Sequence, residues 1–79
     1  MDPNAALQMA ADADYHISDR ISALIGLGEW IARGGCFPDH DPAALDRIGS
    51  VDWAEACDYS GEQAACFDAI AMLHNGIDK

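Results

Sequence analysis

Residues 4–33 read NAALQMAADADYHISDRISALIGLGEWIAR, contain no proline and carry apolar side chains at helical spacing. The apolar positions recur every three or four residues: Leu7, Ala10, Ala13, Ile17, Ile21, Leu24, Gly28 and Ile31. This spacing predicts one long helix, or two helices with a joint near Gly26 or Gly28, because a glycine costs roughly 1 kcal/mol against alanine in a helix. Gly34 and Gly35 are expected to end it as a C-terminal cap.

The second half of the chain predicts further helices and no strand. Asp41 followed by Pro42 is a typical helix start, so we expect a short helix over residues 42–48, stopped by Gly49. Residues 50–74 predict a third helix, or two helices broken near residues 59–61. In a continuous helix one inner face would hold Trp53, Ala56, Cys57, Ser60, Ala64, Phe67, Ile70 and Ala71.

These elements predict an all-α fold. We expect a single helical domain over residues 1–79: a small helical bundle of two long antiparallel helices with a short helix between them. Apolar residues make up 51% of the chain, but many are alanines, which bury little area. The predicted core is therefore thin, and a homodimer that completes it is one alternative for the protein's role.

The charge of the chain restricts its partners. Fourteen acidic residues against four basic ones give a formal net charge of −10. Such a surface repels nucleic acid and anionic membranes, so we expect no direct binding to either, and it attracts basic protein surfaces. The alternative is that the charge serves solubility alone. Because no signal peptide or membrane span is recognisable, we expect a cytoplasmic protein.

The three cysteines, Cys36, Cys57 and Cys66, have no framework spacing and are interpreted as reduced thiols. On one continuous helix Cys57 and Cys66, nine residues apart, would point to opposite sides and share neither a disulfide nor a metal. A helix break near Gly61 would remove this argument.

Rows of carboxylates are the candidate binding feature. Glu55, Asp58 and Glu62 span about 10 Å if they lie on one helix, and Asp12 and Asp19 have a similar spacing on the first helix. Neighbouring phosphates of a nucleic-acid strand lie roughly 6–7 Å apart, so rigid rows of carboxylates suit a groove built for phosphates. The alternative is an ordinary solvated helix face.

Trp30 is the candidate interface anchor. It projects away from the centre of the first helix's apolar stripe, beside Glu29, and tryptophan is enriched among residues that dominate binding energy. The alternative interpretation is that its ring packs under the loop of residues 36–38.

No residue set predicts catalysis, and we expect neither an enzyme nor a cofactor. Ser60 and His74 lie about four helical turns apart, too far for a nucleophile and its base. A small metal-binding protein using His16, His40 or His74 is a further alternative. However, Asp12, His16 and Asp19 on one helix face, and the acids around His40, are explained as well by solvation and helix capping.

In size, charge and helical character the chain resembles small acidic inhibitors encoded by phages and mobile elements, including anti-CRISPR and anti-restriction proteins. The resemblance assigns no role to any residue. It implies a non-catalytic inhibitor that occupies a basic, nucleic-acid-handling surface of a partner protein. The predicted binding residues come from the carboxylate rows and the tryptophan instead, and they are Asp12, Asp19, Glu29, Trp30, Glu55, Asp58 and Glu62. The rival interpretations are a bacterial helical homodimer and a metal-binding protein.

Overall fold

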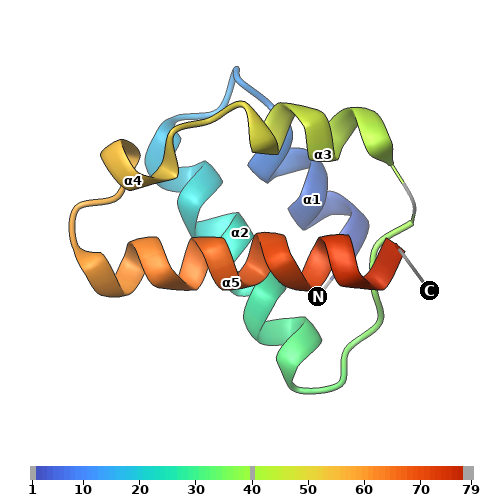
Figure 1. Cartoon of the computed structure of the whole chain (residues 1–79). Helices are drawn as coiled ribbons and strands as arrows, with labels where there is room; N and C mark the ends of the chain where they lie inside the picture. Colours follow the sequence, from blue (N-terminus) through green and yellow to red (C-terminus); the bar gives the residue numbers. More distant parts are fainter. Residues whose placement is uncertain (1, 40, 78–79) are drawn as a thin grey trace.

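The computed structural model describes residues 2–39 and 41–77, and every regular element within them is a helix (Figure 1). The helices are α1 (Pro3–Ala11), α2 (Ile17–Ala32), α3 (Pro42–Gly49), α4 (Trp53–Ala56) and α5 (Ser60–Ile77). The predicted all-α class is therefore confirmed for the described chain.

Local sequence signals fix most helix ends. The carboxylate of Asp41 accepts a hydrogen bond from the Ala44 N–H, with Pro42 in the first turn of α3, as predicted. Asp2 and Asp52 cap α1 and α4 in the same way. At the end of α2, Gly34 has a positive φ of 93° and donates to Ile31, a conformation in which glycine is preferred, so the predicted glycine cap is confirmed.

The joint in the first helical segment lies at residues 12–16, and the predicted joint near Gly26 or Gly28 is wrong. Asp12 takes an extended conformation, and its carboxylate accepts a hydrogen bond from the Asp14 N–H. An aspartate that bonds the following backbone in this way competes with the helix. α2 instead runs through both glycines without a break.

The second half of the chain is also broken, and the alternative of two helices separated near residues 59–61 is confirmed. α4 ends at Ala56, Cys57 is extended with φ −80° and ψ 143°, and α5 begins at Ser60. The break changes which faces of α5 point inward. Between residues 60 and 75, its buried positions are Cys66, Ala69 and Leu73.

The predicted position of Phe67 on an inner face is therefore wrong. Phe67 is 47% exposed, because the face of α5 that packs inward is set by Cys66, Ala69 and Leu73 and no longer by the register of Trp53. Trp53 itself is buried, and its indole N–H donates to the Ile48 carbonyl at 2.9 Å.

α2 is the central element of the packing. It contacts α1 and α5, while α3 packs on α1 and α4 on α5. The predicted arrangement of two long antiparallel helices is not confirmed, because α5 runs across α2 in Figure 1. At their contact, Gly28 approaches Ala69 so closely that a Cβ added to Gly28 would lie 2.7 Å from the Ala69 Cβ.

Candidate functional site

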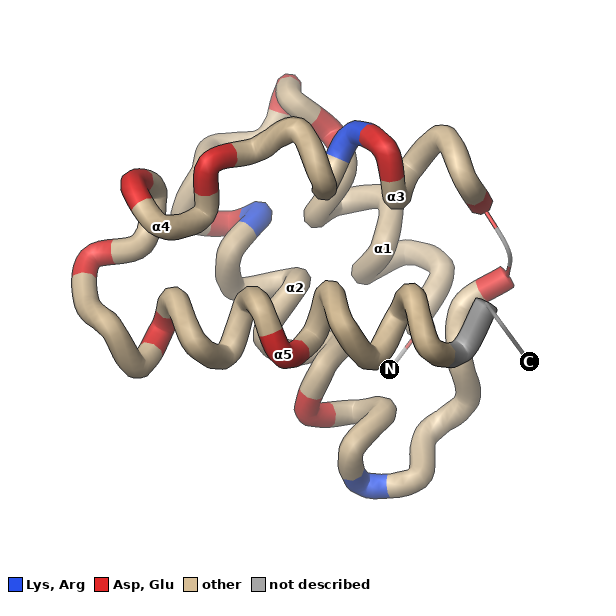
Figure 2. Tube along the Cα trace, viewed as in Figure 1, with Lys and Arg blue, Asp and Glu red and all other residues tan. Residues whose placement is uncertain are grey.

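Acidic residues from three helices gather at one end of the molecule. In Figure 2 acidic segments (red) lie on and before α4, on its connection to α5, and in the first turns of α2 and α5. They are Asp19, Asp52, Glu55, Asp58 and Glu62, a group that we call the acidic end. Four of these five belong to the predicted binding residues, and Asp52 was not predicted.

The carboxylates do not form the straight rows that were predicted. Glu55 lies on α4, Asp58 on the connection and Glu62 on α5, because the chain leaves the helix at Cys57. Asp12 caps the end of α1, whereas Asp19 lies in the first turn of α2. The carboxylates of the acidic end therefore lie near one another because α4, its connection to α5, and the first turns of α2 and α5 meet at this end of the molecule.

The basic neighbour of Asp19 does not offer its charge to the surface. Arg20 is only 8% exposed, and its Nε and Nη2 donate to the carbonyls of Ala10 (3.0 Å) and Ala11 (3.4 Å). Its guanidinium carbon also lies 5.9 Å from the centre of the Trp53 ring, within the range of a cation–π interaction. Arg20 thus directs its donors to the carbonyls at the end of α1.

A groove is open at the acidic end between the starts of α2 and α5 and the end of α4. Its volume is about 240 Å³. We call it the acidic groove, and its lining residues are His16, Ile17, Ser18, Ile21, Ser22, Ala56, Asp58 and Glu62. Of the predicted binding residues it contains Asp58 and Glu62. The sequence indicated Ile17 and Ile21 only as core residues.

The acidic groove combines apolar and charged walls. Ile17, Ile21 and Ala56 give it apolar surface, and Asp58 and Glu62 add two carboxylates. Its volume is below the roughly 300–1,000 Å³ of small-molecule sites, which favours a single side chain as occupant. Lysine and arginine lay their alkyl stems on apolar surface and keep the charged head among polar groups, so the groove suits either of them.

The two carboxylates of the groove, those of Asp58 and Glu62, have different roles in the structure. Glu62 Oε1 accepts a hydrogen bond from the backbone N–H of Asp58 at 3.1 Å, which ties the connection to the first turn of α5. The hydrogen bonds found in the described chain leave the Asp58 carboxylate without a donor. Asp58 is exposed, so its charge is available to a ligand.

His16 lines the groove at the start of α2. Its Nδ1 accepts a hydrogen bond from the Ser18 N–H at 3.2 Å, so the ring serves as the N-cap of the helix. Its Nδ1 also lies 2.8 Å from the Ser18 hydroxyl. The sequence suggested His16 as a metal ligand, and the structure gives it a capping role.

Glu29 and Trp30 lie near the other end of α2, away from the acidic end. Trp30 is half-buried, and its indole N–H donates to the Cys36 carbonyl at 3.0 Å. The ring packs so tightly on Gly35 that an added Cβ there would overlap it. The structure therefore agrees with the alternative interpretation, in which the tryptophan packs under the following loop.

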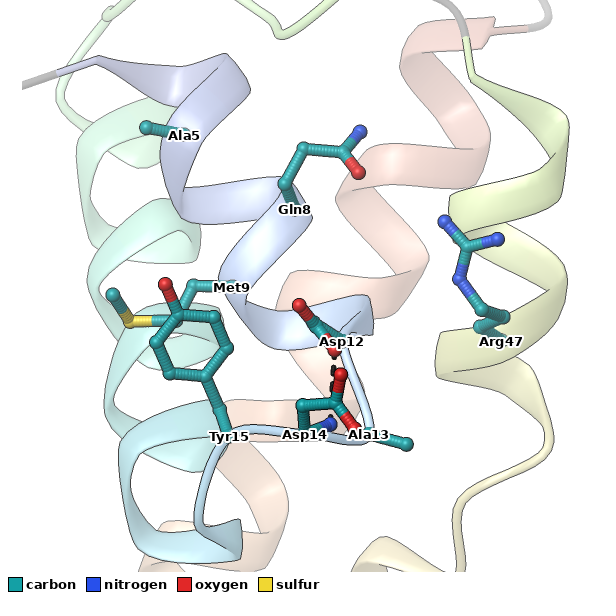
Figure 3. A pocket seen from close by; sticks show the side chains of 8 residues that line it. All are labelled: Ala5, Gln8, Met9, Asp12, Ala13, Asp14, Tyr15 and Arg47. Carbon is teal, nitrogen blue, oxygen red and sulfur yellow. Dashed lines mark hydrogen bonds between the residues drawn. The ribbon is translucent and has the colours of Figure 1, made fainter.

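A larger hollow of about 640 Å³ lies between α1 and α3 (Figure 3). Asp12 and Asp14 line one side, and Arg47 of α3 lines the other. Because this hollow presents both signs of charge, it is a weaker site for a basic ligand than the acidic groove. Asp12 is thus separated from the other predicted acids.

The described residues form no group of three or more histidine, cysteine or acidic side chains placed to hold a metal ion. His40, one of the histidines considered for that role, lies outside the described residues. Across residues 2–39 and 41–77, no helix has the length and apolar character needed to cross a membrane.

Comparison of the chain with protein-family models, curated proteins and solved structures finds no match.

Proposed function

We propose that the protein is a non-catalytic binding protein whose acidic end docks on a basic surface of a partner protein. The observation that carries the proposal is the acidic groove, where Asp58 and Glu62 stand beside the apolar side chains of Ile17 and Ile21. In the bound state a lysine or arginine of the partner lies in this groove. Asp19 and Glu55 add to the attraction from the same end of the molecule.

The partner's surface is one that otherwise holds nucleic acid. A formal charge of −10 on 79 residues attracts clusters of lysine and arginine of the kind that neutralise phosphates. A protein bound to this surface excludes the nucleic acid because it contacts the same lysine and arginine side chains. The proposal therefore makes the protein an inhibitor of a nucleic-acid-handling system, of the anti-CRISPR or anti-restriction type, acting in a bacterial cytoplasm.

Capture with matched variants tests the partner class. The immobilised protein is exposed to bacterial lysate, washed, and eluted with a salt gradient, and the eluted proteins are identified by mass spectrometry. The proposal predicts a nucleic-acid-binding protein that elutes at moderate salt, because screening weakens the contact, and that added DNA or RNA displaces.

Two triple variants with equal charge serve as probe and control. The acidic-end variant carries Glu55→Gln, Asp58→Asn and Glu62→Gln, and the control variant carries Asp14→Asn, Asp46→Asn and Asp68→Asn. The proposal predicts that the partner is lost from the first and kept by the second. Equal retention by both would show that the net charge, and not the acidic end, makes the contact.

The second candidate function is a helical homodimer. The observation that favours it is Phe67, which is 47% exposed on α5 between the exposed Ala64 and Ala71. Burial of this apolar face against a second copy would enlarge the small core. Sedimentation equilibrium of the wild-type protein and a Phe67→Ser variant tests it: a dimer abolished by the substitution supports this candidate, and a monomeric wild type rejects it.

A further inference from the structure

Two cysteine side chains meet where α4 connects to α5. The Sγ atoms of Cys57 and Cys66 lie 3.7 Å apart, although the residues are nine positions apart in the sequence. On one helix they would have pointed to opposite sides, so the prediction that they share no bond depended on a continuous helix. The break after Ala56 turns Cys57 back onto α5.

The two thiols differ in their access to solvent. Cys66 is fully buried in the core, whereas Cys57 is half-buried. Cys57 also has extended backbone outside both helices, so its side chain is not held by a helical turn. The two sulfurs of a disulfide lie about 2.05 Å apart, so a local movement of the Cys57 side chain is enough to bring them within bonding distance.

We propose that Cys57 and Cys66 are a redox modification site, which a small-molecule disulfide such as oxidised glutathione converts to an intramolecular disulfide. In the first step the Cys57 thiolate attacks one sulfur of oxidised glutathione, and a glutathione thiolate leaves. In the second step Cys66 loses its proton to water and attacks Cys57 Sγ, which releases a second glutathione. Both cysteines are oxidised, and one disulfide of the reagent is reduced to two thiols.

The environment of the thiols sets the order of attack. Burial raises the pKa of the Cys66 thiol to about 12, and the hydrogen bond with Cys57 and the negative charge of Glu62 act in the same direction. Cys66 is therefore a poor first nucleophile, while the more accessible Cys57 meets the reagent. Since the thiolate is the attacking form, the second step accelerates as the pH rises.

Cys36 provides an internal contrast. It is exposed, and within the described chain it makes no sulfur–sulfur contact of the kind that joins Cys57 to Cys66. Its reaction with oxidised glutathione is expected to stop at the mixed disulfide. A Cys36→Ser background removes this reaction and any exchange between molecules through this thiol.

The test treats the Cys36→Ser protein with oxidised glutathione under native conditions, quenches with acid and blocks the remaining thiols with N-ethylmaleimide. Digestion after glutamate separates Cys57 from Cys66, because the chain is cut at Glu55 and Glu62. The expected product is a pair of linked peptides that reduction separates. The bond closes a short loop, so the melting temperature is expected to rise by on the order of 10 °C.

Two variants complete the test, each confirmed to be helical by circular dichroism. In the same background Cys66→Ser is expected to keep glutathione on Cys57, since the resolving thiol is gone, and Cys57→Ser is expected to stay unmodified. The proposal is overturned if the parent also stops at the glutathione adduct, or if both of its thiols remain free for N-ethylmaleimide.

Discussion

The guanidinium carbon of Arg20, on α2, lies 5.9 Å from the centre of the Trp53 ring, on α4, although α3 separates these two helices in the sequence. The same guanidinium donates to the carbonyls of Ala10 and Ala11 at the end of α1. One buried cation thus joins α1, α2 and α4. Its hydrogen-bond donors are directed to the end of α1 and not to the carboxylates of the acidic end.

Replacing Arg20 with methionine should destabilise the fold. Methionine fills part of the volume, but it leaves the Ala10 carbonyl without its donor and removes the contact with the Trp53 ring. We expect a loss of about 2–3 kcal/mol in the free energy of unfolding, measured by urea denaturation. The exposed Arg33→Met serves as control and should change it by less than about 0.5 kcal/mol. Equal effects would contradict the structural role of Arg20.

Alanine substitutions at two helical glycines should have opposite effects. At Gly28 the new methyl group would lie 2.7 Å from the Ala69 Cβ, so α2 and α5 must separate, at a cost of about 1–3 kcal/mol. At Gly49 nothing lies within 4 Å, and the substitution should be neutral or stabilise by up to about 1 kcal/mol. Thermal denaturation of both variants and of the wild-type protein measures these changes in stability. A Gly28→Ala protein as stable as the wild type would contradict the close helix crossing.

The start of α3 should contribute to acid sensitivity. Hydrogen bonds from the Ala44 N–H and the Gln8 side chain hold the pKa of Asp41 below its usual value of 3.8. A carboxylate with a lowered folded-state pKa stabilises the fold above the unfolded-state value. That contribution is lost as the pH falls through the folded-state value.

Asp41→Asn keeps a capping oxygen but does not titrate. Its stability should therefore fall less than that of the wild type between neutral pH and about pH 3, as measured by urea denaturation. Asp46→Asn, on the same helix, is the control and should follow the wild-type pH dependence. A parallel loss in the Asp41→Asn and wild-type proteins would contradict the prediction.

The sequence predicted those features that depend on a few adjacent residues. The cap at Asp41 and the glycine stop at Gly34 are local, so both could be read from the chain. The low helix propensity of glycine predicts the first joint near Gly26 or Gly28, and this prediction is wrong. At Gly28 the contact with Ala69 favours glycine, while the helix ends at Asp12, whose side chain bonds the backbone.

The candidate site depended on features that no local pattern contains. Asp58 and Glu62 were predicted as acids of one row, but their position beside Ile17 and Ile21 requires both helix breaks and the packing of α5 on α2. The pairing of Cys57 with Cys66 has the same origin. In the sequence, only the alternative of a helix break near residues 59–61 allows these two cysteines to meet.

We propose that the acidic end, and not charge in general, binds basic side chains. Calorimetry can measure this binding when an oligo-arginine peptide is titrated into the wild-type protein and into the two charge-matched triple variants, at low and moderate salt. We expect Glu55→Gln, Asp58→Asn and Glu62→Gln together to weaken binding by about tenfold or more, while the control variant binds about as tightly as the wild type. Equal weakening of both triple variants would contradict it.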